Sequence, residues 1–256
     1  LDGEDLFAAS DRRIRDLRGG SVAYVFQDPL STLHPLFTVG DQLTEAITTH
    51  QPMSGSKARE KAVELLSLVR IPNAKERLSA YPHELSGGMR QRVCIAMALA
   101  NDAKVLIADE PTTALDVTVQ SQILTLMNGL RRERNAAILF ITHDFGVVSA
   151  LCDRVAVMYA GRIVETGTTE EVLANPRHPY TAKLIECVPV LGEPDRRLDA
   201  IEGRPPVVNN LPDGCAFAER CPHAQASCRT GEINLEMSSE TRGVRCLFPL
   251  NSGATA

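Results

Sequence analysis

The sequence predicts an α/β fold with a mainly parallel sheet, followed by a smaller cysteine-containing extension. Short apolar runs alternate with stretches of helical periodicity, each run ends in polar residues, and this regularity stops near Asn175. The runs are SVAYVF (21–26), KVLIA (104–108) and AAILFIT (136–142), the last two typical of buried strands. Because ligands of α/β sheets bind at the carboxyl ends of the strands, we expect the functional site at that edge of a domain spanning 1–175, with residues 176–256 as the extension.

Apolar spacing predicts helices over 39–50 and 56–70, a helix from Ser86, and another over 117–134. The segment Ile71-Pro72-Asn73 should end the second of these. Residues of about 30–100 therefore form a helical subdomain inserted between the first two strands.

After the third strand, the runs 154–159 and 161–167 meet at Ala160-Gly161 and indicate a hairpin. Thr168 and Glu171 have the spacing of a capping box at the start of a short helix. Residues 176–213 contain seven Pro with little periodicity, which places the domain boundary near 175.

The composition excludes several classes of protein. A net charge of -5 and an aromatic content of 4% argue against a nucleic-acid partner. No apolar run approaches the roughly 18 residues of a membrane span, and the polar N-terminus is not a secretory signal. The chain begins with Leu1 instead of Met, which suggests a start partway through a longer protein.

The stretch HELSGGMRQRVCIAMALA (83–100) opens a helix with Ser86, Gly87 and Gly88. Free backbone N–H groups and the positive end of the helix dipole make such a start a site for an anion. The usual phosphate-binding loop, G-x-x-x-x-G-K-[ST], does not occur in these 256 residues.

The stretch VLIADEPTTALD (105–116) has an apolar run followed by Asp109 and Glu110. The Asp can reach a Mg²⁺ ion, and the Glu, on the other side of an extended chain, can orient or deprotonate a water that attacks a phosphoryl group. A core strand that ends in a solvated acidic turn would look the same.

Gln27 in FQDP (26–29) and His143 in ITHD (141–144) also follow apolar runs. Gln27 could bind the metal or the attacking water, and His143 could donate to a γ-phosphate oxygen. Taken singly, each is better explained as an ordinary loop Gln or as a His packed beneath the sheet.

In this order, Gln27, LSGG (85–88), Asp109-Glu110, Ala114-Leu115-Asp116 and His143 resemble the nucleotide-binding subunits of ABC transporters. The resemblance covers residues 1 to about 175 and implies a partial ABC-type P-loop ATPase domain with a RecA-like sheet core and a helical signature subdomain. It implies two subunits that sandwich two ATP molecules. Gln27, Asp109, Glu110 and His143 would serve the chain's own ATP and Mg²⁺, whereas Ser86, Gly87 and Gly88 would bind the γ-phosphate of the partner's ATP and Asp116 would communicate across the interface.

Full-length relatives also have a P-loop Lys and an adenine-stacking aromatic residue upstream, and neither is found here. We interpret the sequence as a truncated record of a complete protein, in preference to a degenerate, non-catalytic subunit that only lends its signature. A soluble ABC ATPase of DNA repair or translation is a further alternative, which the short insertion of residues 30–85 disfavours.

The seven cysteines form two groups. Cys94, Cys152 and Cys187 stand singly in apolar helical contexts, as buried reduced thiols do. Cys215, Cys221, Cys228 and Cys246 cluster, with spacings that fit neither a C-x2-C zinc ribbon nor a bacterial ferredoxin. Such clustering favours a metal over a disulfide.

NPRHPYTAKLI (175–185) and GCAFAERCPHAQASC (214–228) resemble the C-terminal extension of oligopeptide, dipeptide and nickel importer ATPases. The resemblance suggests a [4Fe-4S] cluster on the four clustered cysteines, with zinc, reduced thiols or a disulfide as alternatives. It further implies an ATPase subunit of a di- or oligopeptide importer at the cytoplasmic face of the cell membrane. Its partners would be a second, similar ATPase subunit, two transmembrane permease subunits and, indirectly, an extracytoplasmic substrate-binding protein. The sequence does not distinguish peptide from nickel or glutathione.

Overall fold

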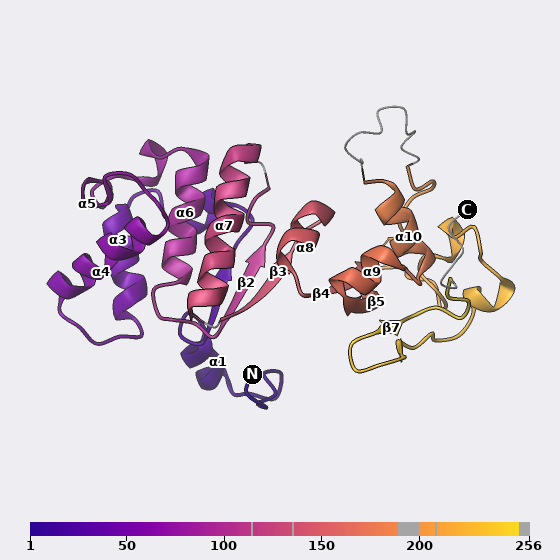
Figure 1. Ribbon diagram of the computed structural model, residues 1–256. Coiled ribbons are helices and arrows are strands. Elements are labelled where there is room, and N and C mark those ends of the chain that lie inside the picture. Colours follow the sequence, from indigo (N-terminus) through magenta and orange to yellow (C-terminus); the bar gives the residue numbers. More distant parts are fainter. Residues whose placement is uncertain (114, 135, 189–199, 208, 251–256) are drawn as a thin grey trace. The chain divides into compact units, whose positions relative to one another are not determined.

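The structure is a computed structural model that describes residues 1–113, 115–134, 136–188, 200–207 and 209–250. The chain divides into two compact units, Leu1–His143 and Asp144–Ala256, which are described separately (Figure 1). Within the described residues, no helix has the length and apolar character needed to cross a membrane.

The first unit contains a parallel sheet in the order β1-β2-β3, formed by β1 (Val22–Val25), β2 (Val105–Asp109) and β3 (Ala137–Ile141). The three predicted strands are thus confirmed. The register pairs Val25 with Ala108, and Ala108 with Phe140. The strands therefore end level with one another, and the loops carrying Gln27, Glu110 and His143 leave the same edge of the sheet.

The strands share a single hydrophobic core with α3 (Val39–Thr48), α4 (Gly55–Leu68), α6 (Gly87–Ala98) and α7 (Val117–Arg134). Helix α6 packs against β1, and α3 and α4 pack against α6. The core includes Val25 and Ala108 of the strands. Helices α6 and α7 run side by side (Figure 1), and Arg92 donates a hydrogen bond to Gln122 across them at 2.6 Å. The predicted helices are confirmed at these positions.

One face of the sheet is partly open. Leu139 is 56% exposed and Ile141 is 42% exposed, so the expectation that residues 136–142 form a fully buried strand is wrong. Side chains alternate along a strand, and only Ile138 and Phe140 point toward the helical core. The apolar run predicted the strand correctly, but it did not indicate whether one face of the strand or both are buried.

Four short elements complete the first unit: α1 (Asp11–Leu17), α2 (Pro29–Thr32), α5 (Ala74–Arg77) and the 3-10 turn η1 (Pro82–Glu84). Thr38 and Asp41 form a capping box at the start of α3. Gly40 lies so close to the segment after α5 that a Cβ there would approach the Leu78 carbonyl oxygen within 2.7 Å. This close approach explains a glycine in the first turn of the helix.

The second unit begins with α8 (Phe145–Leu151) and the antiparallel hairpin of β4 (Arg154–Tyr159) and β5 (Arg162–Thr168). Ala160 and Gly161 both have positive φ, 48° and 78°, as a tight two-residue turn requires. The helix α9 (Thr169–Ala174) follows, with the predicted capping box of Thr168 and Glu171. The hairpin and the cap are confirmed.

The remainder of the unit joins the same sheet. Strands β6 (Glu236–Met237) and β7 (Gly243–Val244) extend it in the order β4-β5-β7-β6. The 3-10 turn η2 (Ala218–Arg220) lies between Cys215 and Cys221, and η3 (Ala226–Arg229) contains Cys228. The pairing of β7 with β5 joins residues on both sides of the boundary near 175 that composition predicts, and both strands lie in the compact unit that starts at Asp144. The Pro-rich stretch also contains a helix that periodicity did not predict, α10 (Pro179–Glu186).

Candidate functional site

The carboxylate of Glu110 is the centre of a hydrogen-bonded group at the carboxyl edge of the parallel sheet. Gln27 donates from Nε2 to Oε2 at 2.9 Å, and Thr113 donates from Oγ1 to the same oxygen at 2.9 Å. His143 Nδ1 lies 3.1 Å from Oε1. The structure therefore brings together three residues predicted as catalytic, from the ends of β1, β2 and β3.

The backbone of Glu110 explains how its side chain reaches these partners. Its φ is 42°, in the left-handed region that side chains other than Gly rarely adopt, and its N–H donates to the Ile141 carbonyl oxygen at 2.9 Å. The expectation that Glu110 follows Asp109 on an extended chain is therefore wrong. Strain of this kind persists where the surrounding structure enforces it, and it is common at functional sites.

Electrostatics keep the Glu110 carboxyl ionised. Hydrogen bonds from His143 and then Thr113 lower its pKa, against a smaller opposing effect of burial. The Glu110 side chain is 24% exposed and the His143 side chain 75%, so the group is open to solvent and to a ligand.

Asp109 lies at the end of β2 with a different partner. The Tyr24 hydroxyl donates to its Oδ2 at 2.8 Å, and this bond raises the pKa of Tyr24. Tyr24 and Thr113 were missed by the sequence reasoning. Thr113 could have been found from its turn spacing after Glu110, whereas Tyr24 reaches Asp109 only through the pairing of β1 with β2.

The signature residues Ser86, Gly87 and Gly88, predicted to bind an anion, lie at the start of α6 (Gly87–Ala98). Ser86 is the N-cap, and its Oγ accepts the N–H of Met89 at 3.3 Å. Within the described residues, no hydrogen bond joins Ser86, Gly87 or Gly88 to the Glu110 group. A Cβ added at Gly87 would meet nothing within 4 Å, so the helix start is open to an approaching ligand.

Gly88 is constrained in a way that Gly87 is not, because a Cβ at Gly88 would lie 2.7 Å from Cγ1 of Val119 on α7. We expect Gly88→Ala to destabilise the first unit by about 1–3 kcal/mol through overpacking. Gly87→Ala should leave the free energy of unfolding within about 0.5 kcal/mol of wild type, because it meets open space. Denaturant unfolding of the two variants measures the difference, and equal stabilities would contradict it.

Asp116 lies at the start of α7, where its Oδ1 accepts the N–H of Val119 at 2.9 Å. This is a helix-capping contact. Its neighbour Ala114, part of the same predicted motif, lies outside the described residues.

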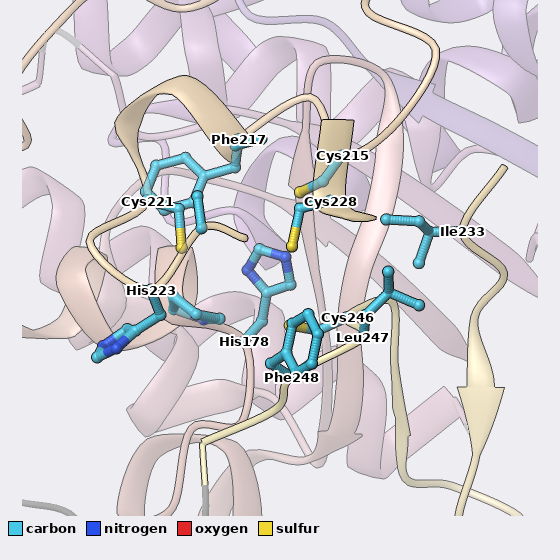
Figure 2. A pocket seen from close by; sticks show the side chains of 13 residues that line it. His178, Cys215, Phe217, Cys221, His223, Cys228, Ile233, Cys246, Leu247 and Phe248 are labelled. Carbon is cyan, nitrogen blue, oxygen red and sulfur yellow. The ribbon is translucent and has the colours of Figure 1, made fainter. Parts of the chain in front are cut away.

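The four clustered cysteines line one pocket of the second unit (Figure 2). The cavity that they enclose is small, with a volume of about 20 Å³. His178 lines it as well, and its imidazole projects between the cysteines (Figure 2). Most of the other lining side chains are apolar, among them Phe217, Ile233 and Phe248.

Burial shifts the pKa values of Cys215, Cys221, Cys246 and His178 toward the neutral forms of these groups. Burial raises the pKa of Cys215 and Cys221 and raises that of Cys246 to about 11, with a further contribution from the charges of the other three thiols. Burial lowers the pKa of His178 to about 4. Backbone hydrogen bonds from Phe217, His223 and Phe248 to Cys215, Cys221 and Cys246 oppose the shifts.

Such N–H···S contacts favour thiolates, the form of cysteine that ligates metals. The donor set therefore fits a thiolate-bound metal in its chemistry. The four thiols are not placed as metal ligands, however. In the part of the chain that the structure describes, no three or more His, Cys, Asp or Glu side chains form a group that could hold a metal ion. The thiols would have to draw together on binding.

Comparisons with known proteins agree with both halves of the chain. Residues 1–113 match the family model of the ABC transporter, and residues 164–228 match that of the oligopeptide/dipeptide transporter, C-terminal region. Among solved structures, the dimeric post-hydrolysis state of the ATP-binding cassette MJ0796 bound to ADP and Pi is 28% identical with a TM-score of 0.60, covering 66% of this chain and 72% of that chain. CbiO1 of Clostridium perfringens, part of the transporter complex cbiONQ, is 31% identical with a TM-score of 0.55, covering 64% and 62%.

Curated relatives match over most of their length. A putative peptide import ATP-binding protein of Brucella abortus (strain 2308) is 51% identical over 226 residues, which cover 88% of this chain and 68% of the relative. The oligopeptide transport ATP-binding protein AppD of Bacillus subtilis (strain 168) is 46% identical over 254 residues, covering 99% and 77%. The probable D,D-dipeptide transport ATP-binding protein DdpD of Escherichia coli (strain K12) is 47% identical over 247 residues, covering 96% and 75%. From the order of its motifs, the parallel sheet that gathers them and these matches, the chain belongs to the ATP-binding proteins of ABC transporters, in the family of the peptide-import ATP-binding proteins.

Proposed function

We propose that the chain is the ATP-hydrolysing subunit of an importer of di- or oligopeptides, at the cytoplasmic face of the cell membrane. The observation that carries the proposal is the Glu110 carboxylate, held by Gln27, Thr113 and His143 at the ends of three parallel strands. A carboxylate positioned in this way, partly exposed and ionised, can orient a water or accept its proton.

Other residues at the carboxyl edge of the parallel sheet have proposed roles in binding Mg²⁺ and ATP. Asp109 and Gln27 offer carboxylate and amide oxygens, the ligand type that Mg²⁺ prefers, and Mg²⁺ neutralises charge on the transferred phosphoryl group when bound. His143 is well exposed and could turn from Glu110 to a γ-phosphate oxygen. Tyr24 holds the Asp109 carboxylate in place at the end of the strand.

The signature residues Ser86, Gly87 and Gly88 would act on a second nucleotide, held by a partner ATPase subunit. The start of α6 supports this role, because helix N-termini bind anions and a Cβ added at Gly87 would meet nothing within 4 Å. Asp116 would lie at the same subunit interface. Two transmembrane permease subunits and a second ATPase complete the proposed assembly, with an extracytoplasmic binding protein delivering the peptide.

The proposal is tested by expressing the full open reading frame that encodes this chain and measuring ATP hydrolysis. We expect turnover that requires Mg²⁺ and rises with protein concentration as dimers form. A protein that binds ATP without turnover, alone and with its partner ATPase, would support the non-catalytic alternative instead.

We further propose that Cys215, Cys221, Cys228 and Cys246 hold a [4Fe-4S] cluster with a structural role. The convergence of the four thiols on one pocket and the N–H groups directed at three of the sulfurs support a metal site. Iron bound by thiolates absorbs visible light, whereas zinc does not.

Anaerobic purification tests this cofactor. We expect a brown protein with iron and sulfide in equal amounts, and loss of both in Cys228→Ser. Cys187→Ser is the control, since Cys187 does not line the pocket and its loss should leave the iron content unchanged. Stoichiometric zinc in a colourless protein would replace the cluster by a zinc site, and the absence of any metal would leave only reduced thiols.

A further inference from the structure

His178 is the most buried polar side chain of the cysteine pocket, and among the residues that the structure describes one of its two ring nitrogens has no hydrogen-bond partner. The residue is 1% exposed. Its Nε2 is buried without a hydrogen bond, and the ring lines the pocket of the four cysteines (Figure 2). Buried polar atoms are normally paired, so an unpaired one that faces a pocket indicates a partner that arrives there.

The other nitrogen fixes which tautomer is present. Nδ1 accepts the backbone N–H of Tyr180 at 3.0 Å, the N-cap contact of α10, and therefore carries no proton. The carboxylate of Glu165 is bound to the backbone N–H of His178 and not to its ring, so nothing favours a charged imidazole in this buried position. In the neutral ring the proton is then on Nε2, and the unpaired atom is a donor.

Because Nε2 is a hydrogen-bond donor, only certain groups can bind it. It cannot ligate a metal through Nε2, because ligation would move the ring proton to Nδ1, which faces the Tyr180 N–H. It can donate to a thiolate or to a metal-bound sulfur, and sulfurs of the four cysteines are the acceptors that line the pocket with it.

We propose that His178 is a positioning residue of the four-cysteine site, whose Nε2–H donates to a thiolate sulfur there and stabilises the site in its metal-bound form. The inference rests on the proposed metal site for its full effect. It gives one ring two contacts: Nδ1 caps α10 and Nε2 supports the sulfurs, so the start of the helix and the metal site are joined through a single side chain.

Two substitutions of His178 separate the helix cap made by Nδ1 from the hydrogen bond donated by Nε2. Asn places its amide where Nδ1 lies in His, so His178→Asn keeps the cap of α10 and removes the donor. Gln reaches as far as Nε2, so His178→Gln keeps a donor toward the pocket and removes the cap. A purely structural role for the residue would make metal retention follow thermal stability in both variants.

The experiment compares wild type, His178→Asn and His178→Gln, purified anaerobically as the full chain, for metal content, thermal midpoint and the rate of metal loss to a chelator. We expect His178→Asn to lose its metal about tenfold faster than wild type, the factor for one hydrogen bond to a charged acceptor. His178→Gln should lose it at nearly the wild-type rate although its thermal midpoint is the lower of the two. Metal loss that is equal in all three, or that follows the thermal midpoints, would overturn the inference.

If the wild-type protein contains no metal, the cofactor proposal is overturned, but the hydrogen bond from His178 to a thiolate can still be tested. Thiol alkylation by iodoacetamide would then be measured against pH in the same three proteins. We expect a higher apparent thiol pKa in His178→Asn than in wild type and His178→Gln, because the thiolate has lost its donor. Identical profiles would refute the role of His178 as well.

Discussion

Glu110→Gln is expected to lower ATP turnover by a factor of about 10²–10⁴ in the protein expressed from its full reading frame, with ATP-bound dimers accumulating. Gln preserves the size of the side chain and its contacts with Gln27 and Thr113, but it cannot accept a proton from water. The free energy of unfolding should therefore change little while the chemical step is lost. Steady-state hydrolysis and gel filtration with ATP measure the two effects.

Glu60→Gln is the matched control, because Glu60 is an exposed carboxylate on α4 far along the chain from the strand ends. It should hydrolyse ATP at the wild-type rate. Turnover in Glu110→Gln equal to that of this control would remove Glu110 as the catalytic base, and with it the assignment of the strand-end group as the catalytic site.

The second large effect is expected at the buried ion pair of the second unit. Arg242 Nη2 lies 2.8 Å from Glu165 Oε1, with side chains only 9% and 0% exposed. The same carboxylate accepts the backbone N–H groups of Arg177 at 2.7 Å and His178 at 2.9 Å. It therefore ties β5 and the segment before β7 to the start of α10.

Arg242→Met should lower the free energy of unfolding of residues 144–256 by about 3–5 kcal/mol, because it leaves a buried carboxylate without its counter-ion. Hydrogen exchange of the β5 amides reports the stability of this unit by itself. Lys183→Ala, which breaks the exposed Lys183–Glu186 pair on α10, should cost less than about 1 kcal/mol. Similar losses in both variants would show that burial does not set the strength of the Glu165–Arg242 pair.

Local signals in the sequence predicted much of the fold and of the strand-end site. The strands β1 to β3, the helices α3, α4, α6 and α7 and the β4–β5 hairpin follow from periodicity and turn residues, which act over a few positions. Gln27, Glu110 and His143 were predicted because polar residues follow the strands and because the order of all the motifs resembles that of ABC subunits. Parallel pairing places those strand ends together. Their common hydrogen-bonded group is a consequence of that register.

What the sequence did not predict depends on distant contacts. The pairing of Glu165 on β5 with Val244 on β7 joins residues almost eighty positions apart, and no pattern within either strand specifies it. Glu110 combines a positive φ with a hydrogen bond from its N–H to Ile141 on the neighbouring strand, and no local pattern of residues indicates either. The surrounding prolines obscured the helix α10 in the sequence, although Pro179 at its first position is a favourable helix-start residue.

The central claim, that this chain drives peptide import, is tested most directly in a reconstituted transporter. The two permease subunits, the second ATPase and the protein from the full reading frame are placed in vesicles, and ATP hydrolysis is measured with and without peptide-loaded binding protein. We predict that the loaded binding protein stimulates hydrolysis and that labelled peptide accumulates with ATP, whereas the complex with Glu110→Gln does neither. Hydrolysis that is indifferent to peptide, with no peptide accumulated, would contradict the account.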